Sequence, residues 1–325
     1  MYVLAFNQSQ AMDEKERKRR EEFLKSQEAF RRNAFKIIKK MLDWCNMTAG
    51  SKKFVDEILH SIFSLGKINN PQFLPEMIFA DDKQILENLK KTYPKPFELY
   101  STQLPRRSPF SCVMDMIVLQ KGQKNENQIL QSLRDFIKEL EPKFLVSSTI
   151  CISQKSNNPN LERYYGVSMS TFGRNPGKIV IAASCCSIWE DYVAGAVMTY
   201  YPKKEKNPDF DGTIKLPKDV RCQAFSLCKE ESMSPCKSCA NLFGLQTTDN
   251  KQWPYGNCAE AESVSNLLKK ENDVKEKAQP TSPTCTETNR QKAKASVEKH
   301  LRDALCMMQF KKWDGNYYTP QTNYS

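Results

Sequence analysis

The sequence predicts an α+β or α/β protein, in which a helical N-terminal region is followed by a mixed sheet with flanking helices. Two observations support this class. Apolar residues recur at helical spacing before residue 105, and short apolar runs typical of strands follow residue 110. The 325 residues, of which 39% are hydrophobic, suffice for one large domain or two modest ones.

Residues 12–44 are expected to form one long basic amphipathic helix. Phe23, Phe30 and Ile37 recur every seven residues, and mostly basic residues surround the stripe they form. The stripe would dock on the core or pair with another helix, which could belong to a protein partner. Alternatively, the basic face would bind a membrane surface or a nucleic acid.

The remaining elements follow from local periodicity and from breakers. Pro94 and Pro96 predict an irregular segment over residues 92–111. Apolar residues at helical spacing predict further helices over 52–65, 81–91, 127–140, 258–270 and 294–312. Apolar runs rich in β-branched residues predict strands over 112–119, 144–152, 164–172, 178–185, 192–201 and 220–227.

These elements suggest four regions. Residues 1–105 are the helical region, and residues 106–272 are a mixed α/β domain that contains the cysteine-rich stretch. Residues 273–292 are charged and carry Pro280 and Pro283, so they are expected to be a mobile linker. Residues 293–325 would form a C-terminal helix and tail.

Composition favours an intracellular protein, cytoplasmic or nuclear. No window approaches 18 consecutive apolar residues, so no transmembrane segment is expected, and the N-terminal apolar run is too short for a secretion signal. In a reducing compartment the 12 cysteines are expected to be buried thiols or metal ligands. The net charge of +11 could attract a nucleic acid or a nucleotide.

The stretch from Cys222 to Cys258 carries the densest chemical signal. Ser234 suits a helix N-cap and Pro235 the first helical position, which places Cys236 and Cys239 on one face of a first turn. A second helix is expected to open in the same way further along. There Asn257 suits the N-cap, Cys258 opens the helix, and Glu260 and Glu262 fall in its first turn.

Helix N-termini stabilise thiolates, and thiolate is the form of cysteine that binds metal. Two such helix ends facing each other would present three thiolates and one carboxylate to a common point. Cys236, Cys239 and Cys258 would then bind Zn²⁺ and leave a fourth coordination position for water, as in catalytic zinc sites.

These residues resemble the zinc-dependent cytidine/adenosine deaminase superfamily, whose signature pairs a His/Cys-x-Glu motif with Pro-Cys-x-x-Cys. Cys258-Ala259-Glu260 matches the first motif, and Pro235-Cys236-Lys237-Ser238-Cys239 matches the second. The resemblance implies zinc on the three cysteines and Glu260 as the proton shuttle for hydrolytic deamination of a nucleobase, nucleotide or nucleic acid. The two motifs stand in reversed order, so the fold would have to be a permuted form of that family's α/β/α layer or unrelated to it.

Alternatives remain open at this point. Cys222 or Cys228 could complete a closed structural zinc site, or the cysteines could be buried thiols of a non-catalytic interaction protein without metal. His60 lies in an amphipathic helix and is expected to have a core or surface role. His300 is expected to be a partly buried, satisfied histidine, because no second candidate ligand lies nearby. The pair Cys185-Cys186 is expected to end a strand and to be structural.

Overall fold

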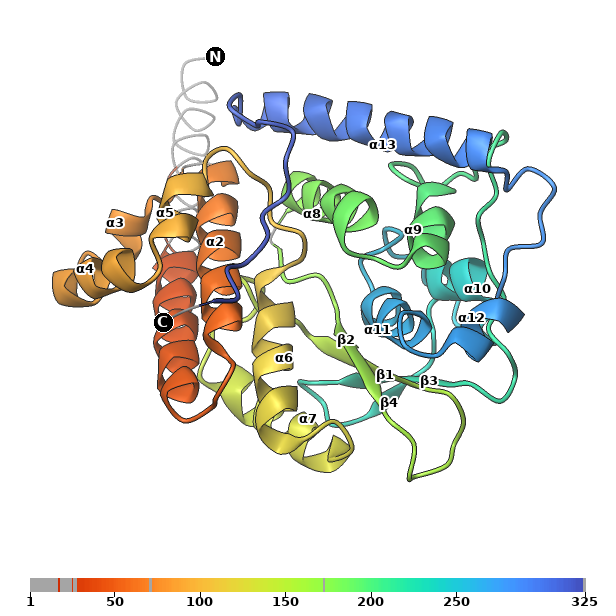
Figure 1. Ribbon diagram of the computed structural model, residues 1–325, viewed down its shortest axis with the longest axis horizontal. Helices are drawn as coiled ribbons and strands as arrows, with labels where there is room; N and C mark the ends of the chain where they lie inside the picture. The colour runs from red at the N-terminus through yellow and green to blue at the C-terminus, as the bar shows by residue number, and fades with distance from the viewer. Residues whose placement is uncertain (1–16, 18–24, 26–27, 70–71, 172, 324–325) are drawn as a thin grey trace, which may run out of the picture.

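A small antiparallel sheet lies between two groups of helices (Figure 1). The computed structural model describes residues 17, 25, 28–69, 72–171 and 173–323. The strands are β1 (Thr149–Gln154), β2 (Tyr164–Val167), β3 (Arg221–Ser226) and β4 (Ser232–Met233). Residues 28–46 are helical, and the labelled helices that follow are α2 (Lys52–Ile68), α3 (Pro75–Ile78), α4 (Lys83–Thr92), α5 (Pro94–Leu99), α6 (Pro109–Lys121), α7 (Glu126–Lys138), α8 (Arg174–Ser187), α9 (Asp191–Met198), α10 (Lys237–Phe243), α11 (Ala259–Leu268), α12 (Asn272–Lys277) and α13 (Glu287–Met307).

The sheet has the strand order β2-β1-β3-β4. Cys151 at its centre is paired with Gly166 on one side and with Ala224 on the other. The predicted α+β class is confirmed, since the helices come first and the sheet is built later in the chain. The sheet differs from the expected mixed sheet in one respect, because its three pairings are all antiparallel.

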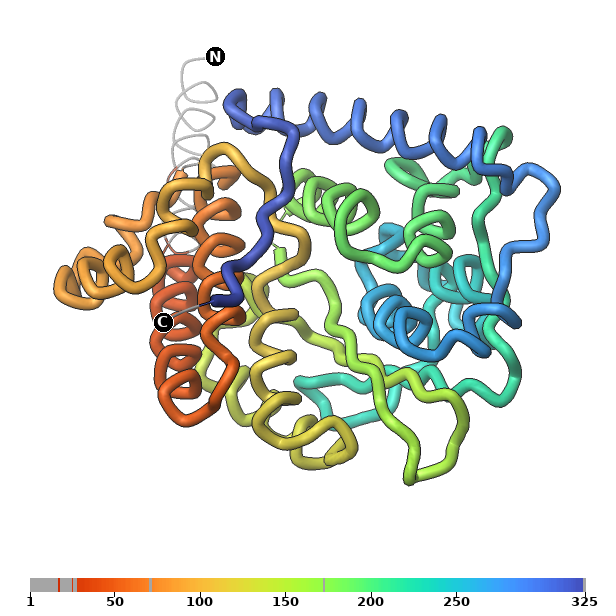
Figure 2. Tube along the Cα trace, viewed as in Figure 1, coloured from red at the N-terminus to blue at the C-terminus, as the bar shows by residue number. Residues whose placement is uncertain are grey.

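Successive side chains of β1 point to opposite faces of the sheet, as the pleat requires. Ile150 and Ile152 pack into the same buried cluster as Ile129 and Phe136, on the side of α6 and α7. Ser153, one residue further, faces α11, where its hydroxyl lies 2.9 Å from that of Ser263. The sheet is therefore covered by helices on both faces, as the tube view also shows (Figure 2).

The N-terminal helix packs into the core over its described part. Phe30 is 5% exposed, and Ile37 and Met41 are fully buried. This is the docking on the core that the apolar stripe predicts. Phe23 and most of residues 12–27 lie outside the described residues, and a protein partner for this helix stays a prediction.

Three expected strands are helices in the structure. Residues 112–119 belong to α6, residues 178–185 to α8, and residues 192–201 largely to α9. Helix α6 is buried around most of its circumference, so its apolar run shows no helical periodicity. Periodicity alone cannot distinguish a strand from a buried helix in a continuous apolar run. Here the run forms a helix that neighbouring elements cover on several sides.

Other expectations hold with shifted bounds. Helices α2, α4, α7 and α11 and strand β3 lie where they were expected, but the expected irregular segment 92–111 contains α5. Strand β1 starts five residues later than expected for 144–152, and β2 ends five residues before 172. The expected linker 273–292 contains α12 and the start of α13, and the division into domains stays a prediction.

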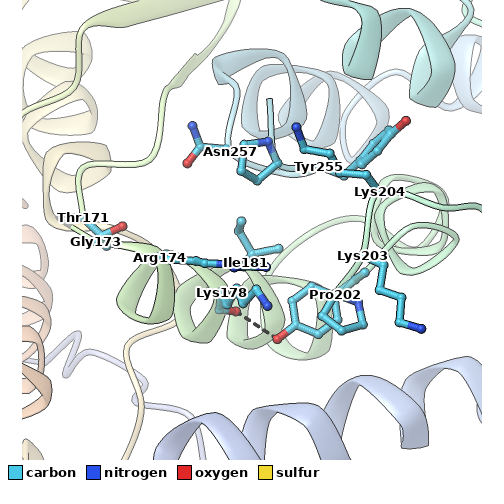
Figure 3. A pocket seen from close by; sticks show the side chains of 13 residues that line it. Thr171, Gly173, Arg174, Lys178, Ile181, Pro202, Lys203, Lys204, Tyr255 and Asn257 are labelled. Atoms are coloured by element: carbon cyan, nitrogen blue, oxygen red, sulfur yellow. Dashed lines mark hydrogen bonds between the residues drawn. The ribbon is translucent and has the colours of Figure 1, made fainter. Parts of the chain in front are cut away.

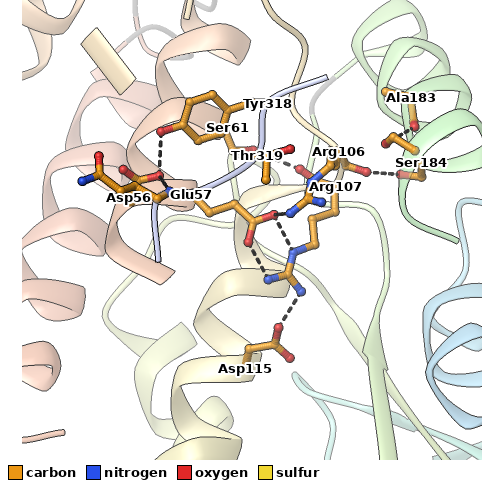
Figure 4. A network of polar contacts seen from close by, with 12 residues as sticks. Asp56, Glu57, Ser61, Arg106, Arg107, Asp115, Ala183, Ser184, Tyr318 and Thr319 are labelled. Atoms are coloured by element: carbon orange, nitrogen blue, oxygen red, sulfur yellow. Dashed lines mark hydrogen bonds and ion pairs between the residues drawn. The ribbon is translucent and has the colours of Figure 1, made fainter. Parts of the chain in front are cut away.

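Arg107 joins three helices in a buried ion-pair network (Figure 4). Its guanidinium donates to Glu57 of α2 at 2.8 Å and to Asp115 of α6 at 2.5 Å. The same group lies 3.8 Å from the carboxylate of Glu262 on α11. Burial alone would raise the pKa of Glu57, but the charge of Arg107 outweighs burial and lowers it.

The C-terminal segment closes over α2 beside this network. Tyr318 is 1% exposed and donates a hydrogen bond to Asp56 at 2.6 Å (Figure 4). The ring of His60 stacks on that of Tyr318 with centroids 3.8 Å apart, and burial lowers the pKa of His60 to about 3. His60 is therefore a core residue, as expected from its helix.

Candidate metal centre

Helices α10 and α11 begin next to each other, and a cysteine occupies the N-cap of each. Cys236 caps α10 and Cys258 caps α11, both with extended backbone angles. The predicted caps, Ser234 and Asn257, are therefore wrong by two residues and one residue. The chain stays extended up to Cys236 because the segment 235–237 is hydrogen-bonded to the loop 247–251, with Lys237 N donating to Lys251 O at 2.9 Å.

The three predicted ligands converge, as the motif spacing requires. The sulfur of Cys236 lies 3.7 Å from that of Cys239 and 3.5 Å from that of Cys258. All three sulfurs lie within 4.8 Å of one another. Thiolates around a tetrahedral metal ion, each about 2.3 Å from it, are about 3.8 Å apart, so the spacing is that of a group that could hold a metal ion.

Neither candidate for a fourth cysteine ligand joins this group. Cys222 lies on β3, and its sulfur is 3.6 Å from that of Cys151 on the neighbouring strand. Cys228 is exposed in the turn after β3. In the described part of the chain, the metal-binding group consists of Cys236, Cys239 and Cys258 alone. A closed four-cysteine site is therefore not formed.

The pKa values of the three thiols favour binding of a cation. The pKa of Cys236 is lowered to about 2, because the thiols of Cys239 and Cys258 stabilise its thiolate and the backbone amides at the start of α10 add to this. The pKa of Cys239 is raised, first by its interaction with Cys236 and then by burial. A divalent cation bound by all three sulfurs would displace the protons that the thiols still carry.

Glu260 stands in the first turn of α11 and is 4% exposed. Together with Cys236 and Cys258 it lines a pocket of about 320 Å³. Burial raises the pKa of its carboxyl to about 7, and the Cys236 thiolate contributes to this shift. Glu260 therefore lines the same pocket as two of the cysteines, and its carboxyl interacts with Cys236 and Cys239.

Glu262, two residues later, faces the other side of the helix. Its carboxylate accepts hydrogen bonds from the backbone N–H of Val167 at 2.9 Å and from the hydroxyl of Ser111 at 3.1 Å. Burial raises its pKa to about 7 against the opposing effect of Arg107. Glu260 thus belongs to the pocket, whereas Glu262 anchors α11 to the interior.

Residues that sequence reasoning missed complete the pocket wall. Trp253 is 44% exposed, and the amine of Lys251 lies 4.4 Å from the centre of its ring. Both line the pocket, as do Met169 and Asn257. They lie in loops without periodicity, and the only signal was the aromatic cluster Trp253-Pro254-Tyr255 shortly before Cys258.

The other candidates of the sequence are structural. His300 on α13 is half-buried, with its Nδ1 atom 2.8 Å from the carbonyl oxygen of Ser296, as expected for a satisfied histidine. Cys185 is buried near the end of α8, so the pair Cys185-Cys186 ends a helix rather than the expected strand.

Comparison with known proteins gives no relative from which a function could be transferred. No family model, no curated protein and no solved structure matches the chain. No helix among the described residues is long and apolar enough to cross a membrane. The geometry of the three cysteines, Glu260 and their pocket is therefore the basis for assigning a function.

Proposed function

We propose that this chain is a zinc-dependent hydrolase of the deaminase type, which acts on the amino group of a nucleobase in a nucleoside, a nucleotide or a nucleic acid. One observation carries the proposal. Three cysteine sulfurs lie within 4.8 Å of one another, two of these cysteines line one pocket together with the buried Glu260, and no fourth described residue completes the ligand set.

The donor set fits zinc in an open site. Three thiolates are soft ligands that select Zn²⁺ over Mg²⁺ or Ca²⁺, and three protein ligands leave one position for a small molecule. When bound, the ion would lower the pKa of a water molecule and so supply a nucleophile at neutral pH.

The remaining chemistry falls to Glu260. Its carboxylate lies beside the ligands and can take a proton from the attacking water and return it to the amino nitrogen. The oxygen bonds to the ring carbon, the carbon–nitrogen bond breaks, and ammonia leaves while a ring carbonyl remains. Trp253 offers a flat wall on which a planar base could stack.

The first experiment measures metal. Purified protein, kept reduced, should contain about one zinc per chain, and Cys236→Ser and Cys258→Ser should lose it. Cys228→Ser is the matched control, because Cys228 is exposed and lies outside the group. Wild-type protein without metal, even after addition of Zn²⁺ or Co²⁺, would refute both the zinc site and the proposed chemistry.

The second experiment measures ammonia released from cytosine- and adenine-containing nucleosides, nucleotides and single-stranded oligonucleotides. Glu260→Gln should keep the zinc and reduce turnover by at least about a hundredfold, as expected for loss of a general acid–base group. A zinc-loaded wild type that deaminates no member of this panel would favour the alternative, a non-catalytic interaction protein with a structural zinc.

We also infer that the protein acts in a reducing compartment, the cytoplasm or the nucleus. All twelve cysteines are free in the structure. Cys236 and Cys258, with sulfurs 3.5 Å apart, would lose their metal ligand function if oxidised to a disulfide.

A further inference from the structure

A second cavity adjoins the metal pocket. It has a volume of about 360 Å³ and lies between the first turns of α8 and the loop that precedes Cys258. Asn257 lines both cavities, while Trp253 belongs to the metal pocket and Tyr255 to the second cavity. The short loop 253–257 therefore separates the two, and a ligand passing beside Asn257 could occupy both.

The second cavity is strongly basic. Arg174, Lys178, Lys203 and Lys204 line it, and no aspartate or glutamate does. Among the described residues, none of these four side chains forms an ion pair with a carboxylate, whereas the amine of Lys204 donates to the backbone carbonyl of Gln252 at 2.9 Å. Like charges that face one hollow repel one another, so an anion that enters it is stabilised by each cation that faces it.

The cations lie on both sides of the hollow (Figure 3). Arg174 and Lys178 project from α8, and the side chain of Lys204 extends on the opposite side, toward Tyr255 and Asn257. Lys203, in contrast, points away from the open space. Burial lowers the pKa of Lys178, and the neighbouring charge of Arg174 adds to this shift, so the two cations are close enough to feel each other.

The backbone adds to the positive potential. The 14-residue helix α8 begins at Arg174, directly after Gly173, which has no side chain to cap it. The N-terminal end of its macrodipole therefore faces the hollow together with the two side chains. On the other wall, the ring of Tyr255 stacks on that of Tyr200 with centroids 3.9 Å apart, so this wall is rigid.

We propose that this basic cavity is a phosphate subsite, which binds the phosphate group of a substrate whose base lies in the neighbouring metal pocket. The substrate part of this inference rests on the proposed function. The cavity would favour phosphorylated nucleosides over free nucleosides, because Arg174 and Lys178 form charge-assisted hydrogen bonds with phosphate oxygens. The phosphate could come from a mononucleotide or from a nucleic-acid backbone.

The test begins with inorganic phosphate, titrated into the full chain and followed by ³¹P NMR at constant ionic strength. The variant Arg174→Gln/Lys178→Gln should weaken binding on the order of tenfold or more, which corresponds to the loss of charge-assisted contacts. Lys203→Gln, on the same loop as Lys204 but pointing away, should bind phosphate within about twofold of the wild type. No phosphate binding by the wild type, or equal binding by the double variant, would overturn the proposal.

The second arm compares cytidine and adenosine with their 5′-monophosphates and with single-stranded oligonucleotides. Tighter binding of a phosphorylated ligand, by about tenfold and lost in the double variant, supports the subsite. A steep decrease of affinity with salt for the oligonucleotide alone identifies a polymer backbone as the source. Equal affinity for nucleosides and their phosphates overturns the subsite.

The outcomes separate the two proposals. If Cys236→Ser and Glu260→Gln behave as expected but the double variant binds and turns over nucleotides like the wild type, the proposed function stands and the subsite fails. If the chain binds no zinc but phosphate binding depends on Arg174 and Lys178, the subsite stands and the proposed function fails.

Discussion

Gly166→Ala tests whether the metal centre depends on the close contact between β2 and α11. A Cβ atom at residue 166 would lie 2.2 Å from the backbone nitrogen of Ser263 and 2.5 Å from the carbonyl oxygen of Ala259. Ordinary carbon contacts begin near 3.5 Å, so the helix and the strand must separate by about 1 Å. Overpacking of this kind costs about 1–3 kcal/mol of unfolding free energy.

The same movement should also weaken metal binding, because Ala259 directly follows the proposed ligand Cys258. Ligand geometry in a functional site is held to about 0.5 Å, so a shift of about 1 Å should lower zinc affinity by at least tenfold. Zinc affinity is measured by competition with a chromogenic chelator, and stability by urea unfolding at pH 7. Gly50→Ala is the control for zinc affinity: its added Cβ meets no atom within 4 Å, but its φ of +74° is strained for alanine, so this variant should lose about 1 kcal/mol of stability and keep the wild-type zinc affinity.

A Gly166→Ala protein with the wild-type unfolding midpoint and zinc affinity would refute the direct packing of α11 on β2. Lower stability with unchanged zinc affinity would show that the three cysteines are positioned independently of this contact. Lower stability together with weaker zinc binding is the expected result.

Three further predictions concern the scaffold. Arg107→Met leaves the buried Glu57 with only the more distant Arg106, 3.7 Å away, and should cost about 3–5 kcal/mol in urea unfolding. Arg32→Met removes half-exposed ion pairs and should cost less than about 1 kcal/mol. In the folded chain Glu262 keeps its proton up to about pH 7, whereas in the unfolded chain it loses the proton near pH 4.5. The unfolding free energy of the wild type should therefore fall relative to that of Glu262→Gln as pH rises from about 4.5 to 7, by up to about 3 kcal/mol. A difference that does not depend on pH would contradict this. Ile37→Ala should lower the free energy of unfolding by about 2–5 kcal/mol, because Ile37 is fully buried. The control Lys39→Ala, at an exposed residue of the same helix, should leave the unfolding midpoint unchanged. Equal midpoints for the two variants would place the apolar stripe of the N-terminal helix outside the core.

The sequence was informative where polar residues recur at helical spacing, on an exposed face in α4 and α7 and on a buried face in α2. These patterns predicted the three helices with bounds close to those observed. It failed where a buried helix has a continuous apolar run. Residues Ile179 to Ala183 of α8 are all 3% exposed or less, so nothing polar marks a helical period there. Which apolar run becomes a strand then depends on neighbours distant in the chain.

The candidate site was easier to predict than the fold around it. Cys-x-x-Cys at a helix start can bring two sulfurs together by local geometry alone, and an acid two residues after Cys258 lies on the same first turn. The pocket could not be predicted, because Trp253, Lys251 and Asn257 reach it from a loop whose path is set by contacts such as that between Ser238 and Trp253 O at 2.6 Å.

The reversed order of the two motifs has a geometric explanation. The centre needs two helix N-termini that meet, and the segment 244–258 returns the chain from the end of α10 to the start of α11 beside it. Either helix could precede the other, so agreement of these residues with a deaminase motif carries information about the site and none about the ancestry of the fold.

Helix α11 is the element on which the proposed chemistry depends. In its first turn Glu260 lines the pocket and Glu262 contacts Arg107, so one short helix has one face toward the pocket and one toward the scaffold. A change at Glu262 should therefore alter the free energy of unfolding strongly and leave the metal ligands unchanged. A change at Glu260 should instead alter turnover strongly and the free energy of unfolding little. If Glu262→Gln abolished turnover at full zinc content and with the wild-type unfolding midpoint, Glu262 and not Glu260 would be the residue that acts on the substrate.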